Sequence, residues 1–191
     1  MSTTSQTEYT HLLTPQNAIL LIVDIQDRLF PHMHEGKQLA DNTAILIQSA
    51  YHLGIPIIVS EQYPRGLGST IPQLQQLLAK ETLIFEKRAF GCWEDAAIRN
   101  SIQSLARPQL LVCGIETHIC MSQTVHQLLD ADYEVHIAVD ATTSREETSK
   151  QLGLQKMQTS GAILTNTEMA MFELLQTSRH PQFKALQSLI K

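Results

Sequence analysis

The stretch LLVCGIETHICMSQTVHQLL, residues 110–129, decides the fold because one short turn in it joins two kinds of regular structure. Its first residues are almost all apolar, as expected of a strand that is covered on both faces of a sheet. From about His118 to Asp130 the apolar residues recur at helical spacing. A turn with Cys120 at its end connects the two. The stretch therefore predicts one strand–turn–helix unit of a parallel α/β sheet.

The same alternation continues along the rest of the chain. Including the strand above, six short apolar runs predict strands, at residues 18–24, 55–62, 82–87, 109–114, 134–140 and 162–166. Longer helical patterns alternate with them, at residues 36–54, 71–80, 93–106, 144–160, 167–178 and 181–191. Strand–helix–strand crossovers are right-handed and place helices on both faces of a sheet. We predict a three-layer α/β/α sandwich with a six-stranded, mainly parallel, Rossmann-like sheet.

The composition is typical of one compact domain. Of the 191 residues, 43% are hydrophobic and 17% charged, and the formal net charge is −5. This mildly acidic balance disfavours a nucleic-acid or membrane-surface partner, and no apolar run approaches the roughly 20 residues of a membrane span. We expect a flexible N-terminal segment, 1–15, followed by a single domain, 16–191. Three cysteines without regular spacing fit free thiols in the cytoplasm better than a disulfide framework.

Residues that follow strands are the first candidates for chemistry, because ligands of such sheets bind beyond the carboxyl ends of the strands. Asp24 ends the first strand, Lys87 ends the third, and Cys120 lies just after the fourth. Each also has an ordinary interpretation, since an aspartate can cap a segment, a lysine can be solvated and a cysteine can be an inert core residue.

Taken together, the three residues supply a nucleophile, its base and a charge stabiliser. The free N–H groups and the dipole at a helix N-terminus favour an anion, and a nearby ammonium stabilises a thiolate. The pattern therefore predicts a thiol of low pKa at Cys120.

These motifs resemble the cysteine hydrolases of the isochorismatase-like superfamily, most closely its isochorismatase domain-containing subgroup. The similarity covers nearly the whole chain, through AILLIVDIQDRLF, IIVSEQYPRGLGSTIPQL, FEKRAFGCW, LLVCGIETHIC, VDATTSR and SGAILTNTE. It implies a hydrolase that cleaves a small amide or related carbonyl compound through a thioester on Cys120. Asp24 would take the thiol proton and Lys87 would orient and polarise the pair. It also implies a cis peptide at Ile115–Glu116 and an oxyanion hole formed by the N–H groups of Glu116 and Cys120.

The resemblance leaves the substrate open. Five residues just past strand ends are candidates for substrate binding or for packing, and they are Gln26, Leu29, Tyr63, Phe90 and Trp93. Arg65 is a candidate for binding a substrate carboxylate. Nicotinamidases carry an Asp and His metal site after the second strand, where this chain has VSEQYPRGLGST without a histidine. We therefore expect no metal and no other cofactor.

Two further functions stay open. One is a non-catalytic binding or scaffold protein that keeps the hydrolase fold. The other is a redox-sensing thiol protein in which Cys120 is oxidised together with Cys92 or Cys113. A nucleotide-binding Rossmann protein is disfavoured because no G-x-G-x-x-G follows the first strand. Since proteins of this resemblance usually assemble, we expect a homo-oligomer whose partner is a small-molecule substrate.

Overall fold

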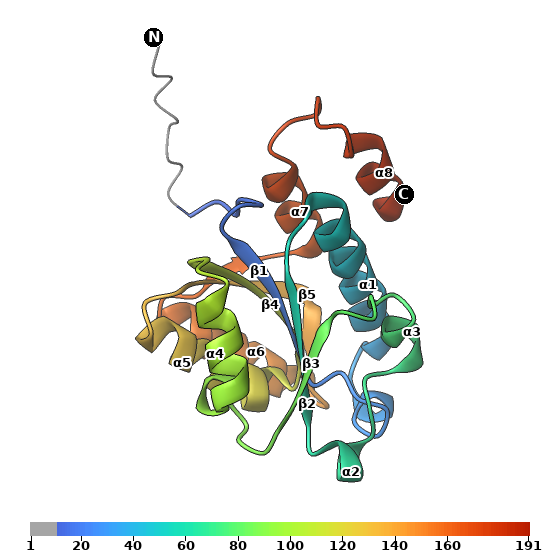
Figure 1. The fold of residues 1–191 in the computed structure, drawn as a ribbon. Coiled ribbons are helices and arrows are strands. Elements are labelled where there is room, and N and C mark those ends of the chain that lie inside the picture. Colours follow the sequence, from blue (N-terminus) through green and yellow to red (C-terminus); the bar gives the residue numbers. More distant parts are fainter. Residues whose placement is uncertain (1–10) are drawn as a thin grey trace.

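A six-stranded sheet forms the centre of the protein, and a computed structural model describes it over residues 11–191 (Figure 1). The strands are β1 (Ala18–Val23), β2 (Ile57–Gln62), β3 (Leu83–Lys87), β4 (Gln109–Ile115), β5 (Glu134–Thr143) and β6 (Ile163–Thr165). Their order is β3-β2-β1-β4-β5-β6, and every neighbouring pair is parallel. The predicted fold class is confirmed, with a sheet that is parallel throughout.

Most of the predicted flexible segment, 1–15, falls on residues 1–10, which lie outside the described part of the chain. Within the described part, Leu13 is fully buried and its N–H donates to Glu173 Oε2 at 3.0 Å. The N–H of Thr14 donates to Gln109 Oε1 at 2.9 Å. These contacts hold the chain against the sheet before β1 begins.

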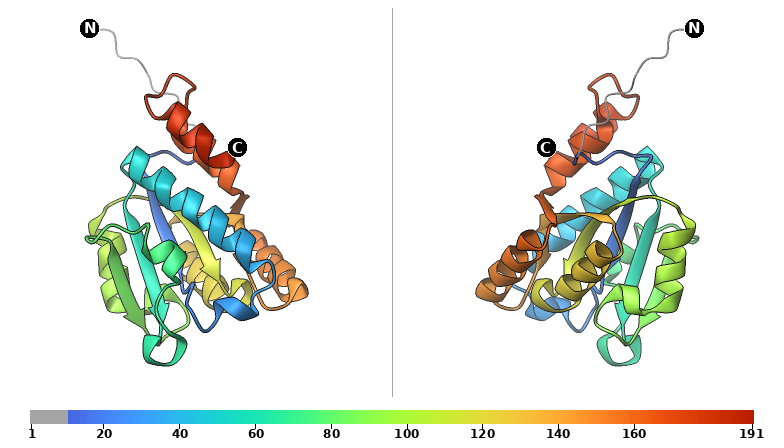
Figure 2. Two further views of the ribbon diagram at one scale, coloured as in Figure 1. Left: turned by 90° about the vertical axis from the view of Figure 1, so that its right-hand side faces the viewer. Right: turned by 90° about the vertical axis from the view of Figure 1, so that its left-hand side faces the viewer.

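The central strands are buried because helices cover both faces. Alternate residues of β1 enter two different cores, with Leu20 and Ile22 on one face and Ile19 and Leu21 on the other, as the period of a strand requires. The first face is covered by α1 (Gly36–Leu53), α3 (Pro72–Gln75) and α7 (Thr167–Leu175), with α8 (Phe183–Gln187) packed outside α7. The second is covered by α4 (Ala96–Ser104), α5 (Ser122–Asp130) and α6 (Glu147–Thr159). Figure 2 shows α1 across one face and α5 with α6 across the other.

Several helix bounds differ from the prediction, and three of them have a local explanation. The helix expected at residues 71–80 spans only Pro72–Gln75, and Thr70 does not cap it because its hydroxyl and N–H bond to Glu61. The helix expected from Trp93 begins after Asp95, whose carboxylate accepts from the first-turn N–H groups. The helix expected from His118 begins at Ser122, because residues Thr117–Met121 form a wider π turn.

In the described residues no helix combines the length and the apolar character needed to cross a membrane. The sheet order reverses between β1 and β4, where β1 is followed by Asp24 and β4 by the turn that carries Cys120. The carboxyl ends of these strands point to the lower edge of Figure 1. This is the place at which parallel sheets bind ligands.

Candidate active site

The structure brings Asp24 and Lys87 into direct contact. Asp24 follows β1 with a left-handed φ of 53°, and Lys87 is the last residue of β3, two strands away. The long lysine side chain reaches past β2, and its Nζ lies 2.7 Å from Asp24 Oδ2. Both side chains have no solvent exposure. The two residues form a buried ion pair beneath the carboxyl edge of the sheet.

The Lys87 ammonium is satisfied by several acceptors at once. Besides Asp24 it donates to Gln62 Oε1 at 2.8 Å, to the Phe90 carbonyl at 2.8 Å and to the Ala89 carbonyl at 3.2 Å. Burial by itself lowers the pKa of Lys87, but the Asp24 carboxylate reverses this effect and the pKa lies above its ordinary value. Lys87 is therefore a permanent cation that also fixes the start of the loop after β3.

Cys120 completes the cluster. It lies in the π turn between β4 and α5, is 6% exposed, and lies close enough to Asp24 and Lys87 for both charges to act on its thiol. Burial and the Asp24 charge raise the pKa of the Cys120 thiol well above its ordinary value, and the Lys87 ammonium offsets them only in part. The predicted low pKa is wrong, because the charge of Lys87 is already balanced by Asp24. The resting thiol keeps its proton.

Side-chain contacts with the end of β5 hold the Cys120 turn in place. They are Glu116 Oε2 with Arg145 Nε at 3.1 Å and with the Arg145 N–H at 3.0 Å, Thr117 Oγ1 with Thr142 Oγ1 at 3.0 Å, and His118 Nδ1 with Ser144 Oγ at 2.9 Å. The Ile115–Glu116 peptide is cis. At Gly114, with a φ of 130°, any Cβ would collide with the backbone of Val23. The Cys120 turn is thus held by β1 on one side and by β5 on the other.

Gly153 lies in the interior of α6, and close packing against the Cys120 turn explains why a glycine occupies this position. A Cβ at this position would lie 3.1 Å from the backbone of Thr117 and His118. In a free helix, Gly→Ala stabilises by about 1 kcal/mol. Here we expect Gly153→Ala to lower the free energy of unfolding by about 1 kcal/mol instead, because the added methyl group overpacks the turn.

Urea denaturation measures this effect. Gly36→Ala is the matched control, since a Cβ at Gly36 would make ordinary contacts at 3.5 Å with Phe30. Equal stabilisation by the two substitutions would show that the approach of α6 to the turn is not a constraint.

The other predicted site residues are divided between packing and the site edge. Gln26 is fully buried, and its amide bonds to the backbone of Gln62 at 2.8 and 3.0 Å and to the Gly68 carbonyl at 2.6 Å. It therefore holds the loop after β2. Leu29 is half-buried against the core under α1. The ring of Trp93 packs edge to face on Tyr133, which follows α5, with centroids 5.4 Å apart.

Tyr63 and Phe90 are the exposed aromatic residues of this edge. Tyr63 is 40% exposed and Phe90 is 53% exposed. Tyr63 directly follows β2, and its N–H donates to the Lys87 carbonyl. The Arg88 guanidinium lies 3.9 Å from the centre of the Tyr63 ring. Arg65 is exposed in the four-residue helix α2 (Pro64–Leu67).

Two residues of the cluster were missed from the sequence. Ser60 donates its hydroxyl to Asp24 Oδ1 at 2.7 Å, and Gln62 accepts from Lys87. The signal was present, because both are polar residues at the carboxyl end of the buried run IPIIVSEQ, the same position that singled out Asp24 and Lys87.

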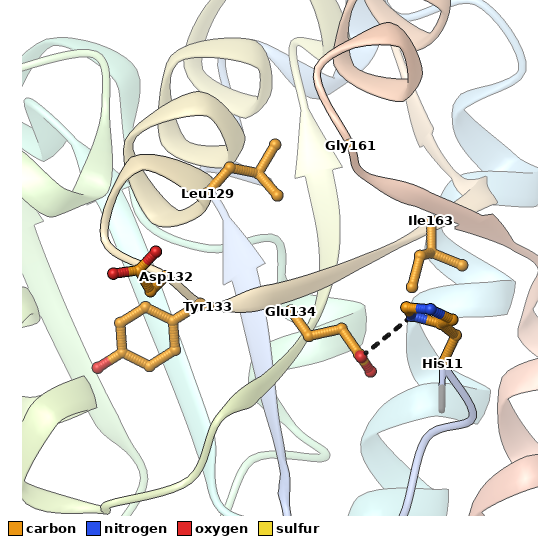
Figure 3. A pocket seen from close by; sticks show the side chains of 7 residues that line it. All are labelled: His11, Leu129, Asp132, Tyr133, Glu134, Gly161 and Ile163. Atoms are coloured by element: carbon orange, nitrogen blue, oxygen red, sulfur yellow. Dashed lines mark ion pairs between the residues drawn. The ribbon is translucent and has the colours of Figure 1, made fainter. Parts of the chain in front are cut away.

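Two open hollows in the surface lie away from this cluster. One, of about 510 Å³, is at the amino end of β5 and is lined by His11, Leu129, Asp132, Tyr133, Glu134, Gly161 and Ile163 (Figure 3). The other, of about 440 Å³, is lined by residues at the start of α1. Within residues 11–191 no three His, Cys, Asp or Glu side chains are grouped as ligands of a metal ion.

The fold and the cluster define a parallel α/β protein with a buried carboxylate, ammonium and thiol at the carboxyl edge of its sheet. The chain belongs to the isochorismatase domain family, whose model matches residues 18–169. Isochorismatase domain-containing protein 2 of Danio rerio is 35% identical over 179 residues, which are 93% of this chain and 89% of that protein.

Solved structures agree with this assignment. MAR1 ribonuclease from Caenorhabditis elegans is 35% identical with a TM-score of 0.89, over 94% of this chain and 92% of that one. The YcaC gene product of Escherichia coli, described as an octameric hydrolase of unknown specificity, has a TM-score of 0.89 over 96% of this chain and 91% of that one. At 20% identity, the latter likeness shows the fold alone.

Proposed function

We propose that the protein is a metal-independent cysteine hydrolase that cleaves a small amide or related carbonyl compound. The observation that carries this proposal is the position of the Asp24 carboxylate, which pairs with the Lys87 ammonium and lies near enough to the Cys120 thiol for its charge to raise the pKa of that thiol. A thiol whose pKa is raised is a poor nucleophile by itself. Beside a buried carboxylate it becomes a nucleophile at the moment when its proton is transferred.

The charges of the cluster suit this transfer. When the proton passes from Cys120 Sγ to Asp24, the negative charge moves from the carboxylate to the sulfur, while the Lys87 ammonium stays fixed beside both. The net charge of the three side chains is zero before and after the step. In a buried site, where separating charges is expensive, such a neutral rearrangement needs little reorganisation.

The proposed reaction has two stages. Cys120 Sγ bonds to the carbonyl carbon while Asp24 takes the thiol proton, and the oxyanion rests on the N–H groups of Glu116 and Cys120, each of which contributes roughly 3 kcal/mol. Asp24 then gives the proton to the leaving nitrogen, the C–N bond breaks, and a thioester remains. A water molecule, deprotonated by Asp24, attacks the thioester carbon, and the proton returns to the departing sulfur.

The surroundings indicate a small substrate. Because Cys120 is only 6% exposed, we propose that only a small molecule reaches its sulfur and that Tyr63 and Phe90 border the approach. Gln26, Leu29 and Trp93 are assigned to packing and loop support. We also propose that the protein acts in the cytoplasm, since all three cysteines are free. Homo-oligomer formation is supported by the exposed apolar residues Leu83 and Ile84 of the edge strand β3.

The proposal is tested by trapping the acyl intermediate. The protein is incubated with a panel of small amides, carbamoyl compounds and ureides, and intact-mass spectrometry follows covalent adducts while product release is measured. We expect one compound class to give an adduct that maps to Cys120 and is absent in Cys120→Ala. An RNA oligonucleotide is a separate arm because of the name of the Caenorhabditis elegans relative. Hydrolysis that survives in Cys120→Ala, of RNA or of any panel member, would contradict the proposed mechanism.

A further inference from the structure

Cys92 is a second thiol beside the candidate site, and the proposed reaction does not use it. It lies in a short 3₁₀ turn, Cys92–Glu94, that follows the loop after β3, and it is fully buried. Its Sγ is 3.5 Å from Ser60 Oγ, and that oxygen is 2.7 Å from Asp24 Oδ1. Cys92 and Asp24 are therefore linked through one serine hydroxyl.

The direction of this hydrogen-bond chain follows from its chemistry. An ionised carboxylate can only accept hydrogen bonds, so the Ser60 hydroxyl must donate to Asp24. Its lone pairs are then left to accept from the Cys92 thiol. Burial and the Asp24 charge raise the pKa of Cys92 to about 11, so this thiol keeps the proton that it donates. The direction of both hydrogen bonds is therefore fixed, from Cys92 to Ser60 and from Ser60 to Asp24.

Cys92 is held in turn by the helix that follows the nucleophile. The Cys92 N–H donates to Thr124 Oγ1 at 2.9 Å, and Thr124 is fully buried on α5. Thr124 lies four residues after Cys120 in the sequence. The hydrogen bonds thus link Asp24, Ser60, Cys92 and Thr124 in one chain that ends on the helix following Cys120.

Given the proposed role of Asp24 as the base, we propose that Ser60 is a positioning residue that orients the Asp24 carboxylate toward Cys120, and that Cys92 orients Ser60. Asp24 Oδ2 is held by Lys87 and Oδ1 by Ser60, so the plane of the carboxylate is set from both ends. Without the Ser60 donor the negative charge of the carboxylate beside the sulfur is less dispersed, which makes the Cys120 thiolate harder to form.

A double-mutant cycle tests this inference through alkylation of Cys120 by iodoacetamide, which requires no turnover. The second-order rate constant is measured at one alkaline pH by mass mapping of Cys120. We expect Ser60→Ala to slow alkylation roughly tenfold, as loss of a charge-assisted hydrogen bond implies. Cys92→Ala should slow it about threefold, in keeping with a weaker S–H donor. The double variant should equal Ser60→Ala alone, because Cys92 acts through Ser60.

The controls separate orientation from general packing. Ser60→Thr keeps the donor and should restore the rate to within about twofold. Ser49→Ala removes a buried hydroxyl that has no hydrogen-bond partner among the described residues, and Cys113→Ala removes a buried thiol of β4. Both should leave the alkylation rate unchanged. If Ser60→Ala does not fold, Ser60→Cys, with its weaker donor, replaces it and should slow alkylation by an intermediate factor.

Two results would overturn the inference. One is that the effects of Ser60→Ala and Cys92→Ala on the alkylation rate add in the double variant, and the other is that Ser60→Ala is alkylated at the wild-type rate. Failure of the hydrolase proposal gives a different result. In that case the cycle still shows coupling, while the substrate panel yields no adduct on Cys120. If only the present inference fails, the adduct forms and the cycle is additive.

Discussion

Asp24→Asn is expected to reduce hydrolysis by about 10³-fold while making Cys120 react faster with alkylating reagents. The loss of hydrolysis follows from removal of the proposed general base, which is typically worth 10²–10⁴-fold. The gain in alkylation follows from charge. Without the carboxylate, the buried Lys87 ammonium has lost its counter-ion, and the Cys120 thiolate takes that place. A variant that is less active yet more reactive is the specific signature of this cluster.

The pH dependence of Cys120 alkylation shows whether the Asp24 carboxylate raises or lowers the pKa of the thiol. Burial and the Asp24 charge hold the pKa of Cys120 above the ordinary thiol value of 9.0. In the wild type, the alkylation rate should therefore keep rising, about tenfold per pH unit, through the pH at which an ordinary thiol levels off. In Asp24→Asn one of the two causes is removed while Lys87 still favours the thiolate, so the whole profile should move to lower pH.

The measurement is the rate of Cys120 alkylation from neutral to alkaline pH, with Asp41→Asn as the control. Asp41 is a carboxylate on α1 that pairs with Lys37 at the surface, away from the cluster. Its substitution should leave the profile in place. If the profiles of Asp24→Asn and the wild type coincide, the carboxylate does not govern the thiol and the proposed base is wrong.

Lys87→Met is expected to lower the free energy of unfolding by about 3–5 kcal/mol, because it leaves the Asp24 carboxylate buried without its cation. Met has a similar length and is apolar, so the cavity that remains is small. The Gln62, Ala89 and Phe90 acceptors also lose their shared donor. Urea denaturation at neutral pH measures the loss, together with the disappearance of hydrolysis.

The double variant Asp24→Asn/Lys87→Met is the matched control. Removing both charges avoids the uncompensated carboxylate, so the double variant should be more stable than Lys87→Met alone. A loss below about 1 kcal/mol in Lys87→Met, as for a solvated ion pair, would mean that the lysine is not held as the buried partner of Asp24.

Much of the fold could be predicted from the order of apolar runs along the chain. The six strands, the parallel sheet and the helix that stops at Gly54 are all confirmed, because strand burial and helix periodicity are local properties of the sequence. The helix starts were less predictable. Thr70 has the side chain of a cap, but Glu61, nine residues earlier, holds it in a different contact. A long-range partner decided the outcome there.

The candidate site shows the same division. Asp24, Lys87 and Cys120 stood out because each follows a strand of a parallel sheet, and carboxyl ends of such strands meet at one edge. Ser60 lies at the carboxyl end of a strand as they do, and Cys92 was considered only as an oxidation partner of Cys120, because the sequence does not show that both side chains are linked to Asp24. Tyr63 and Trp93 looked alike as aromatic residues after strands, yet one stays exposed at the edge and the other packs against Tyr133.

By itself, the sequence determined the parallel α/β sheet and the set of residues at its carboxyl edge. Only the tertiary structure decided the protonation of Cys120, because the pKa of a thiol depends on its burial and on the distances to charges that come from other strands. The Lys87 ammonium was expected from the sequence to stabilise a Cys120 thiolate. In the folded protein the Asp24 carboxylate neutralises that ammonium. The sequence lists the residues, but the electrostatic environment of each side chain forms only when segments that are distant in the sequence come together in the fold.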